Sequence, residues 1–280
     1  MKTAIITGAD GGMGYQETKE VAAAGYHVIM ACYNIEKAEG KRQSLIRETH
    51  NEHIEIMHID LANLSSVLDF ANQVKMRIDH LHLLMNNAGT LETGRHITVD
   101  GLERTVSVNY VGPWLLTRLL LPLMGQGSRI VNMASCVYPL GRLHFPHFFL
   151  QGRKGAFWRI PVYCNTKLAI LLFTLCLAER LKDSGITVNA ADPGIVDTEI
   201  IRMHMFIDPL TDLFFRPLIR TPRQGADTAI RLLLDDSLQG VTCSLFRSGH
   251  PVRLGSRYTA HAQKEELWQL TEEIVAPFLS

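Results

Sequence analysis

The most constraining feature of this sequence is a glycine-rich turn near its start. An apolar run at residues 2–7 predicts a strand, the turn T-G-A-D-G-G-M-G follows at residues 7–14, and an amphipathic run continues to Ala24. A second predicted strand at residues 26–32 closes the unit. Glycines in such a turn, here Gly8, Gly12 and Gly14, let the backbone approach a pyrophosphate at a helix N-terminus. The unit therefore predicts an α/β fold that binds a dinucleotide.

The end of the second strand is ambiguous about the coenzyme. An acid at this place reads a ribose 2′-hydroxyl, and an Arg accepts a 2′-phosphate. This chain has Tyr33 and Asn34 there, and Glu36 and Lys37 follow with opposite charges. The choice between NAD and NADP therefore stays open at this point.

Polar or small residues follow three further predicted strands, at residues 54–59, 81–85 and 128–135. The first ends at Asp60, the second in N-N-A-G at residues 86–89, and the third delivers Ser135. In an open α/β sheet, ligands bind at this edge. Asp60 has two interpretations, as a cap of the next helix or as a contact for an adenine amine.

Helical spacing and a lack of linker sequence indicate one domain, residues 1–280. Predicted helices lie at residues 34–50, 98–124, 159–181, 222–236 and 262–278, with a last strand at 241–246. We therefore expect a three-layer Rossmann fold, in which helices flank a parallel sheet of about seven strands.

The helix at 159–181 carries Tyr163 and Lys167, which are four residues apart and so share one face. A cation about 4 Å from a phenol favours the phenolate by roughly 4 kcal/mol at an effective dielectric of ~20. We therefore expect Lys167 to lower the pKa of Tyr163, which makes the phenol usable as an acid or base. The Y-x-x-x-K spacing alone also occurs by chance on many helices.

Charge and cysteine content narrow the partners. The chain has 28 basic and 28 acidic residues, so no net field points to nucleic acid or an anionic membrane. Its five cysteines lack C-x-x-C spacing and suit a reducing compartment, and the histidines at 50–58 suggest a solvated turn, so we expect no metal. With no predicted signal peptide or membrane span, the expected localisation is cytoplasmic.

The order of these motifs resembles that of the short-chain dehydrogenase/reductase superfamily. They are T-G-A-D-G-G-M-G, Asp60, N-N-A-G, Asn109, Ser135, Y-C-N-T-K and P-G-I-V-D-T. The resemblance implies that Tyr163 donates or accepts a proton, and that Lys167 binds the nicotinamide ribose and lowers the phenol's pKa. It also implies that Ser135 holds the carbonyl oxygen and that Asn109 belongs to a water relay.

Within this superfamily the chain is similar to the retinol-dehydrogenase-like branch along its whole length. The shared segments are L-G-R-L-H-F at 140–145, Q-G at 151–152, Y-C-N-T-K-L-A at 163–169, T-P-R-Q-G-A at 221–226 and L-W at 267–268. The branch implies NADP(H) and apolar carbonyls or alcohols, and the superfamily implies pairing through the helices at 98–124 and 159–181 as a homodimer or homotetramer. Tyr33 stands where the branch commonly has Arg, so only a slight lean to NADP follows.

The resemblance also completes the set of residues expected to contact NAD(P). They are Gly8, Asp10, Gly11, Gly12, Met13, Gly14, Tyr33, Asn34, Asp60, Leu61, Asn87, Ala88, Gly89, Tyr163, Lys167, Pro193, Gly194, Val196 and Thr198. The catalytic set is Asn109, Ser135, Tyr163 and Lys167.

An inserted loop at 136–158 and a lid at about 197–220 are rich in apolar side chains. The loop holds Phe145, Phe148, Phe149, Phe157 and Trp158, and the lid holds Met203, Met205, Phe206, Leu210, Leu213, Phe214 and Phe215. They predict a pocket for an apolar aldehyde, ketone or alcohol, although a subunit interface or shielding of the core would need the same residue types.

Two alternatives from other classes stay open. One is a coenzyme-binding sensor or interaction protein without turnover, against which the intact set of four catalytic residues argues. The other is an extended epimerase or dehydratase, which usually needs a larger C-terminal part than this chain has.

Overall fold

A single mixed sheet forms the centre of the molecule. The computed structural model describes residues 1–145, 147–149, 157–197 and 219–279. The sheet has eight strands in the order β3-β2-β1-β4-β5-β6-β7-β8. They are β1 (Thr3–Thr7), β2 (His27–Cys32), β3 (Ile54–His58), β4 (Leu83–Asn86), β5 (Arg129–Met133), β6 (Thr187–Asp192), β7 (Ser244–Arg247) and β8 (His250–Val252).

The predicted Rossmann architecture is confirmed, with one edge strand more than expected. Strands β1 to β7 are parallel, and β8 pairs with β7 in the antiparallel direction. The sequence signal for β8 is weak because the strand has three residues and contains Pro251, which is compatible only with an edge position.

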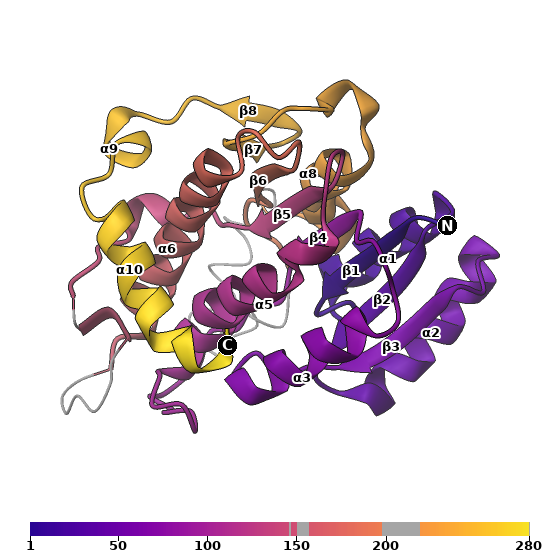
Figure 1. Ribbon diagram of the computed structural model, residues 1–280, viewed down its shortest axis with the longest axis horizontal. Helices are drawn as coiled ribbons and strands as arrows, with labels where there is room; N and C mark the ends of the chain where they lie inside the picture. The colour runs from indigo at the N-terminus through magenta and orange to yellow at the C-terminus, as the bar shows by residue number, and fades with distance from the viewer. Residues whose placement is uncertain (146, 150–156, 198–218, 280) are drawn as a thin grey trace.

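Helices cover both faces of the sheet (Figure 1). The main ones are α1 (Gly12–Ala23), α2 (Ile35–Thr49), α3 (Leu64–Lys75), α5 (Gly112–Leu120), α6 (Arg159–Arg180), α8 (Pro222–Leu234) and α10 (Lys264–Val275). Short helical turns are α4 (Arg104–Val106), η1 (Ser107–Val111), η2 (Leu121–Leu123), η3 (Tyr138–Leu140), η4 (His147–Phe149), η6 (Asp236–Leu238), α9 (Ser256–Thr259) and η7 (Ala276–Phe278).

Side chains that point to opposite faces of the sheet divide the core into two hydrophobic clusters. Ile5 and Ile29 pack with α3, α5, α6 and α10, whereas Ile6 and Met30 pack with α1, α2 and α8. Successive side chains of a strand point to opposite faces, so strands covered on both faces must be apolar at nearly every position. This arrangement leaves the carboxyl ends of the parallel strands as the edge where a site can form.

The helix predicted at 98–124 begins six residues later than expected, at Arg104. Glu103 caps it, because its Oε2 accepts a hydrogen bond of 3.0 Å from the amide of Val106. The preceding residues instead make a turn in which Ile97 bridges to Glu103 and Gly101 has φ +76°. Helical spacing alone does not show this start, because the turn residues continue the apolar pattern.

The central helix α6 agrees closely with the prediction of residues 159–181. By length and composition it is the described helix that could span a membrane, with a mean hydropathy of 1.7. Within that window 72% of the helix is buried inside the fold, as expected for a core helix.

The C-terminal helix α10 packs across α5 and α6 (Figure 1). The ring centroid of Trp268 lies 5.1 Å from that of Trp114 and 6.0 Å from that of Phe173. The guanidinium groups of Arg118 and Arg180 lie 5.3 and 4.3 Å from the Trp268 ring centroid. The homodimer or homotetramer stays a prediction, and α10 covers part of the two helices expected to form its interface.

The aromatic residues of the inserted loop do not all serve a pocket. Phe148 and Phe149 are buried in the core, and the Phe148 ring lies 5.7 Å from that of Tyr110. For these two residues the shielding interpretation is the right one. Trp158, by contrast, is 70% exposed. The predicted lid, with its apolar residues, lies outside the described residues except at its ends, and so does Thr198.

Candidate active site

The glycine turn forms a close backbone cradle at the start of α1. Gly8 has φ +62°, a conformation that residues with a Cβ rarely adopt. A Cβ on Gly14 would lie 2.2 Å from the carbonyl oxygen of Gly8 and 2.7 Å from Nδ2 of Asn87. No side chain fits there, so the first turn of α1 packs directly on the loop. The amides at the N-terminus of α1 therefore stay accessible to a pyrophosphate, and these residues fit a dinucleotide.

A cleft of about 640 Å³ opens along this edge of the sheet. Most of the residues predicted to contact the coenzyme line it, namely Gly8, Asp10, Gly11, Gly12, Met13, Gly14, Tyr33, Asp60, Leu61, Asn87, Ala88 and Gly89. Its wall also includes Ala31, Lys37, Lys41, Ile59, Thr90, Arg104, Val108, Asp197 and Pro222. The cleft thus joins the ends of β1, β2, β3 and β4.

The N-N-A-G turn braces the strands on either side of the cleft, as predicted. The Asn87 side chain donates to the carbonyl oxygen of Thr7 at 2.9 Å, and the Thr7 hydroxyl accepts from the amides of Asn87 and Ala88. Asn86 donates to Asn132 Oδ1 at 2.7 Å and ties β4 to β5. These hydrogen bonds fix the backbone that a coenzyme would lie against.

Asp60 lines the cleft and does not cap α3. Its Oδ1 accepts a hydrogen bond of 2.8 Å from the amide of Ala62, which closes a local turn. Asn63 is the cap, because its Oδ1 accepts from the amides of Ser65 and Ser66. Of the two interpretations of Asp60, the helix cap is wrong, and contact with an adenine amine stays a prediction.

Asn34 is the N-cap of α2, and its contact with a coenzyme stays a prediction. Its Oδ1 accepts a hydrogen bond of 2.8 Å from the amide of Lys37, so its side chain caps α2 and does not line the cleft. Tyr33 lines the cleft and is 62% exposed. Lys37 and Lys41 lie one helical turn apart on α2 and both line the cleft. The sequence analysis missed Lys41, although the spacing of the two lysines was a signal for it.

The predicted catalytic residues come from three neighbouring segments. Ser135 follows β5 and is 8% exposed, and Tyr163 and Lys167 lie on α6. Lys167 is 3% exposed, and its Nζ donates to the carbonyl oxygen of Met133 at 2.9 Å. Burial lowers the pKa of Lys167 to about 8, against the opposing effect of the Asp192 carboxylate.

The expected direction of the Tyr163 pKa is wrong. Burial raises the pKa of Tyr163 to about 12, and its hydrogen bond with the Ser135 side chain opposes this rise only in part. Nζ of Lys167 lies 5.5 Å from the Tyr163 ring centroid and is held by Met133. Desolvation of the phenolate therefore outweighs the attraction of the ammonium. The phenol is protonated at neutral pH, as a proton donor must be.

Asn109 lies in the π-helical turn η1 and is fully engaged by its neighbours. Its Oδ1 accepts from the amide of Thr90 at 2.7 Å, and its Nδ2 donates to the carbonyl oxygen of Thr90 at 2.9 Å and to Thr166 Oγ1 at 3.2 Å. Such π turns are frequent at functional sites. A Cβ on Gly89 would lie 3.4 Å from Asn109 Oδ1 and 3.8 Å from Lys167 Nζ. Gly89 therefore lies between the cleft, which it lines, and the predicted catalytic residues.

The P-G-I-V-D-T segment closes the site beyond β6. Gly194 has φ +75°, and its amide donates to Asp192 Oδ1 at 2.9 Å. Val196 forms a parallel bridge with Arg220, whose Nη1 donates to the carbonyl oxygen of Pro193 at 3.2 Å. Contacts of Pro193, Gly194 and Val196 with a coenzyme stay predictions.

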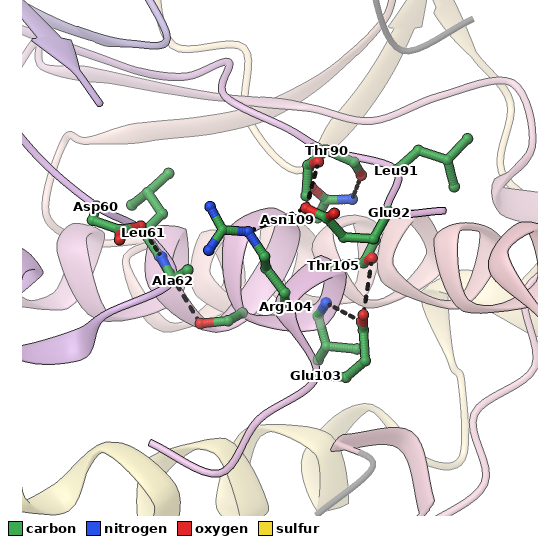
Figure 2. A network of polar contacts seen from close by, with 12 residues as sticks. Asp60, Leu61, Ala62, Thr90, Leu91, Glu92, Glu103, Arg104, Thr105 and Asn109 are labelled. Carbon is green, nitrogen blue, oxygen red and sulfur yellow. Dashed lines mark hydrogen bonds and ion pairs between the residues drawn. The ribbon is translucent and has the colours of Figure 1, made fainter. Parts of the chain in front are cut away.

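A polar network that the sequence analysis missed lies beside the cleft (Figure 2). Glu92 accepts hydrogen bonds from Arg104 and Thr90, each at 3.1 Å. Arg104 precedes Val108 by one turn, and both line the cleft. The helix predicted at residues 98–124 already placed Arg104 on the same face as Val108, so this spacing was a signal for it.

Comparison with known proteins agrees with this geometry. A family model described as short chain dehydrogenase matches residues 2–149 and 150–204. Human retinol dehydrogenase 11 is 35% identical over 277 residues, which cover 98% of this chain and 86% of that protein. Human retinol dehydrogenase 13 is 36% identical over 252 residues, which cover 88% of this chain and 76% of that protein.

Solved structures show the same fold. An uncharacterized protein from Mycobacterium paratuberculosis aligns with a TM-score of 0.77 at 28% identity, covering 99% of this chain and 94% of that one. A blue fluorescent protein from a metagenomic library, solved in complex with NADPH, aligns with a TM-score of 0.70 at 25% identity, covering 88% of this chain and 95% of that one. The chain therefore belongs to the short-chain dehydrogenase family and is an NAD(P)-dependent oxidoreductase.

Proposed function

We propose that this enzyme interconverts an apolar aldehyde or ketone and its alcohol, with NADP(H) preferred over NAD(H). The observation that carries the proposal is the convergence of Ser135, Tyr163 and Lys167 next to a cleft lined by a glycine cradle. Cytoplasmic localisation stays a prediction.

In the proposed reaction, the glycine cradle and Lys167 would hold a nicotinamide coenzyme, which would supply hydride transfer to the carbonyl carbon or from the alcohol. The Ser135 hydroxyl fixes the carbonyl oxygen, and the Tyr163 phenol delivers its proton to that oxygen as charge develops there. Burial keeps the phenol protonated at neutral pH, with a pKa raised to about 12, which suits the reducing direction. Lys167 carries its charge below about pH 8 and would bind the ribose hydroxyls of the nicotinamide half.

The apolar nature of the substrate is supported by side chains on segments that adjoin the site. Leu140, Trp158, Ile160 and Ile195 are all large, apolar and at least 40% exposed. They lie on η3, at the start of α6 and next to Gly194, close in sequence to the predicted catalytic and coenzyme residues. The two human relatives named above are retinol dehydrogenases, and retinol is a long apolar alcohol.

We predict that kcat/KM rises with chain length in a series of straight-chain aldehydes. Each buried methylene contributes ~0.8 kcal/mol, so the expected increase is roughly fourfold per methylene until the pocket is filled. The measurement is steady-state turnover at saturating NADPH. Better turnover of short polar carbonyls than of long apolar ones would refute the substrate class. Tight NADPH binding with no turnover across the series would favour the sensor alternative.

The coenzyme preference is supported by two lysines in place of the missing Arg. Lys37 and Lys41 line the cleft together with Tyr33, at the end of β2 where the adenosine ribose is read in this fold. A second hollow of about 420 Å³ beside the cleft is lined by Lys41, Ser44, Tyr15 and Glu48 with the glycine turn, and Glu48 is paired with Lys19. The ammonium groups of Lys37 and Lys41 in the cleft wall suit a 2′-phosphate and would gain little from a 2′-hydroxyl.

We predict that the variant carrying Lys37→Met and Lys41→Met binds NADPH about tenfold more weakly, because two charge-assisted contacts to a phosphate are lost. Its Kd for NADH should stay within about twofold of wild type. The measurement is a fluorescence titration of each coenzyme. The exposed Lys75 at the end of α3 provides the control substitution, Lys75→Met. Equal weakening of both coenzymes, or tighter NADH than NADPH binding by wild type, would overturn the preference.

A further inference from the structure

An ion pair that the proposed mechanism does not use lies in the wall of the coenzyme cleft. Nε of Arg104 donates to Oε1 of Glu92 at 3.1 Å. Arg104 lines the cleft together with Asp60 and Leu61. Figure 2 shows the outer end of its guanidinium directed toward Asp60 and Leu61, away from Glu92. The pair therefore anchors one nitrogen of the guanidinium and aims the others into the cleft.

Glu92 holds a second donor from a different segment. The same Oε1 accepts a hydrogen bond from Thr90 Oγ1 at 3.1 Å. The Glu92 side chain is 22% exposed, whereas that of Arg104 is 37% exposed. A half-buried carboxylate that accepts two hydrogen bonds ties the turn after β4 to the start of α4, since hydrogen bonds to an ionised acceptor are the stronger kind.

Thr90 connects this carboxylate to the predicted catalytic residues. Both backbone groups of Thr90 bind the Asn109 side chain, at 2.7 and 2.9 Å. Nδ2 of Asn109 also donates to Thr166 Oγ1, and Thr166 Oγ1 donates to the carbonyl oxygen of Tyr163 at 2.7 Å. A continuous set of hydrogen bonds therefore runs from the cleft wall at Arg104 to the backbone of Tyr163.

The local backbone keeps Arg104 in this position. Its amide donates to the carbonyl oxygen of His96 at 2.8 Å, and the preceding residue, Glu103, caps the helix that Arg104 begins. Because both the backbone and Nε of Arg104 are held, little conformational freedom is left to lose when a ligand meets its outer nitrogens.

The part of the coenzyme that meets Arg104 follows from the position of the pair in the sheet. In this fold the ends of β2 and β3 hold the adenosine half of the dinucleotide. Asp60 and Leu61 follow β3, so Arg104 faces that half. An adenine edge carries both ring-nitrogen acceptors and an amine donor. The Arg104 guanidinium can donate to the ring nitrogens, and the Asp60 carboxylate can accept from the amine.

We propose that Arg104 binds the adenine end of the coenzyme and that Glu92 is a positioning residue for both Arg104 and Asn109. This inference rests on the proposed function. Arg104 acts on NADP(H) and NAD(H) alike, because the two coenzymes have the same base. It therefore differs from Lys37 and Lys41, whose effect depends on the 2′-phosphate. Glu92 additionally acts on turnover, because Thr90 and Asn109 lose their support when it is removed.

The test compares Arg104→Met, Glu92→Ala and Glu92→Gln. Fluorescence titrations of NADPH and NADH give the Kd values, and turnover at saturating coenzyme gives kcat. For Arg104→Met we expect both Kd values to rise by a similar factor, about tenfold, as for loss of one charged hydrogen-bond donor. For Glu92→Ala we expect the same rise and a fall of about tenfold in kcat. Glu92→Gln should recover most of kcat, because an amide oxygen still accepts from Thr90 Oγ1.

The control is Arg77→Met, which removes an exposed pair with Glu55 that lies outside the cleft. Three results would overturn the inference: Arg104→Met weakening NADPH alone, Glu92→Ala with the kcat of wild type, or a lower melting temperature in these variants with Kd and kcat unchanged. The wild-type titration separates failure of this inference from failure of the proposed function. If the wild-type protein binds neither coenzyme, both the proposed function and the inference are refuted. If the wild-type protein binds coenzyme, the variants alone decide the inference.

Discussion

The substitution Tyr163→Phe is expected to lower kcat for carbonyl reduction by about 10²- to 10⁴-fold, the range for loss of a general acid. The phenylalanine keeps the aromatic ring at this position of α6 and removes only the hydroxyl, whose pKa is raised to about 12 by burial. Coenzyme Kd should change little, because the substitution keeps the ring and leaves Lys167, which would bind the nicotinamide ribose, in place. The measurements are single-turnover reduction at saturating NADPH and a coenzyme titration.

The control for this change is another buried tyrosine. Tyr110 is fully buried, and its hydroxyl lies 2.8 Å from Thr271 Oγ1 of α10, on the side of η1 that faces the core. Tyr110→Phe removes the same atom from a site without chemistry and should keep kcat within about twofold, with a stability loss of ~1 kcal/mol for one hydrogen bond. If Tyr163→Phe kept near-normal turnover, a different proton donor would have to be sought.

The sequence predicted the cleft because its residues are adjacent in the chain or fixed by steric rules. The glycine turn between a strand and a helix admits few conformations, and Gly14 packs so closely on Gly8 that no other residue fits. Asn87 was predicted as a brace and is one, since its amide reaches Thr7 across neighbouring parallel strands. Such features depend on local backbone geometry, which the residue types in a short sequence pattern determine.

The sequence did not predict quantities that depend on burial and on neighbours distant in the chain. The pair Tyr163 and Lys167 has the expected spacing, but the carbonyl of Met133 engages the ammonium, and desolvation controls the pKa of the phenol. Phe148 and Phe149 belong to an apolar loop, and only the structure shows that they fill the core near Tyr110. A residue type alone does not separate a pocket from a core.

A buried carboxyl group, Glu17, is expected to make the stability of the protein depend on pH. Glu17 lies on the buried face of α1 at 0% exposure, and within the described part of the chain neither of its carboxyl oxygens has a hydrogen-bond partner. Burial raises its pKa from 4.5 to about 8, because the charged form loses its hydration and gains no partner. The neutral acid is therefore the form that the folded state favours.

The direction of the effect follows from proton binding. Between about pH 4.5 and pH 8 the folded state keeps the Glu17 proton, and the unfolded state has released it. Stability from this group is fully present below pH 4.5 and is lost as the pH rises to about 8, where the loss is complete. A shift of this size corresponds to roughly 5 kcal/mol, since each pKa unit is worth ~1.36 kcal/mol.

Glu17→Gln should remove this pH dependence, because a glutamine has nearly the same shape and carries no charge at any pH. We expect the variant to be more stable than wild type by roughly 3 to 5 kcal/mol at pH 9 and similar to it near pH 5. Denaturant unfolding at a series of pH values, without added coenzyme, measures the difference. The exposed Glu273 supplies the control, Glu273→Gln, whose curve should run parallel to that of wild type. Parallel curves for Glu17→Gln and wild type would mean that Glu17 is already ionised in the folded protein, with water or a shift of α1 against α8 relieving its burial.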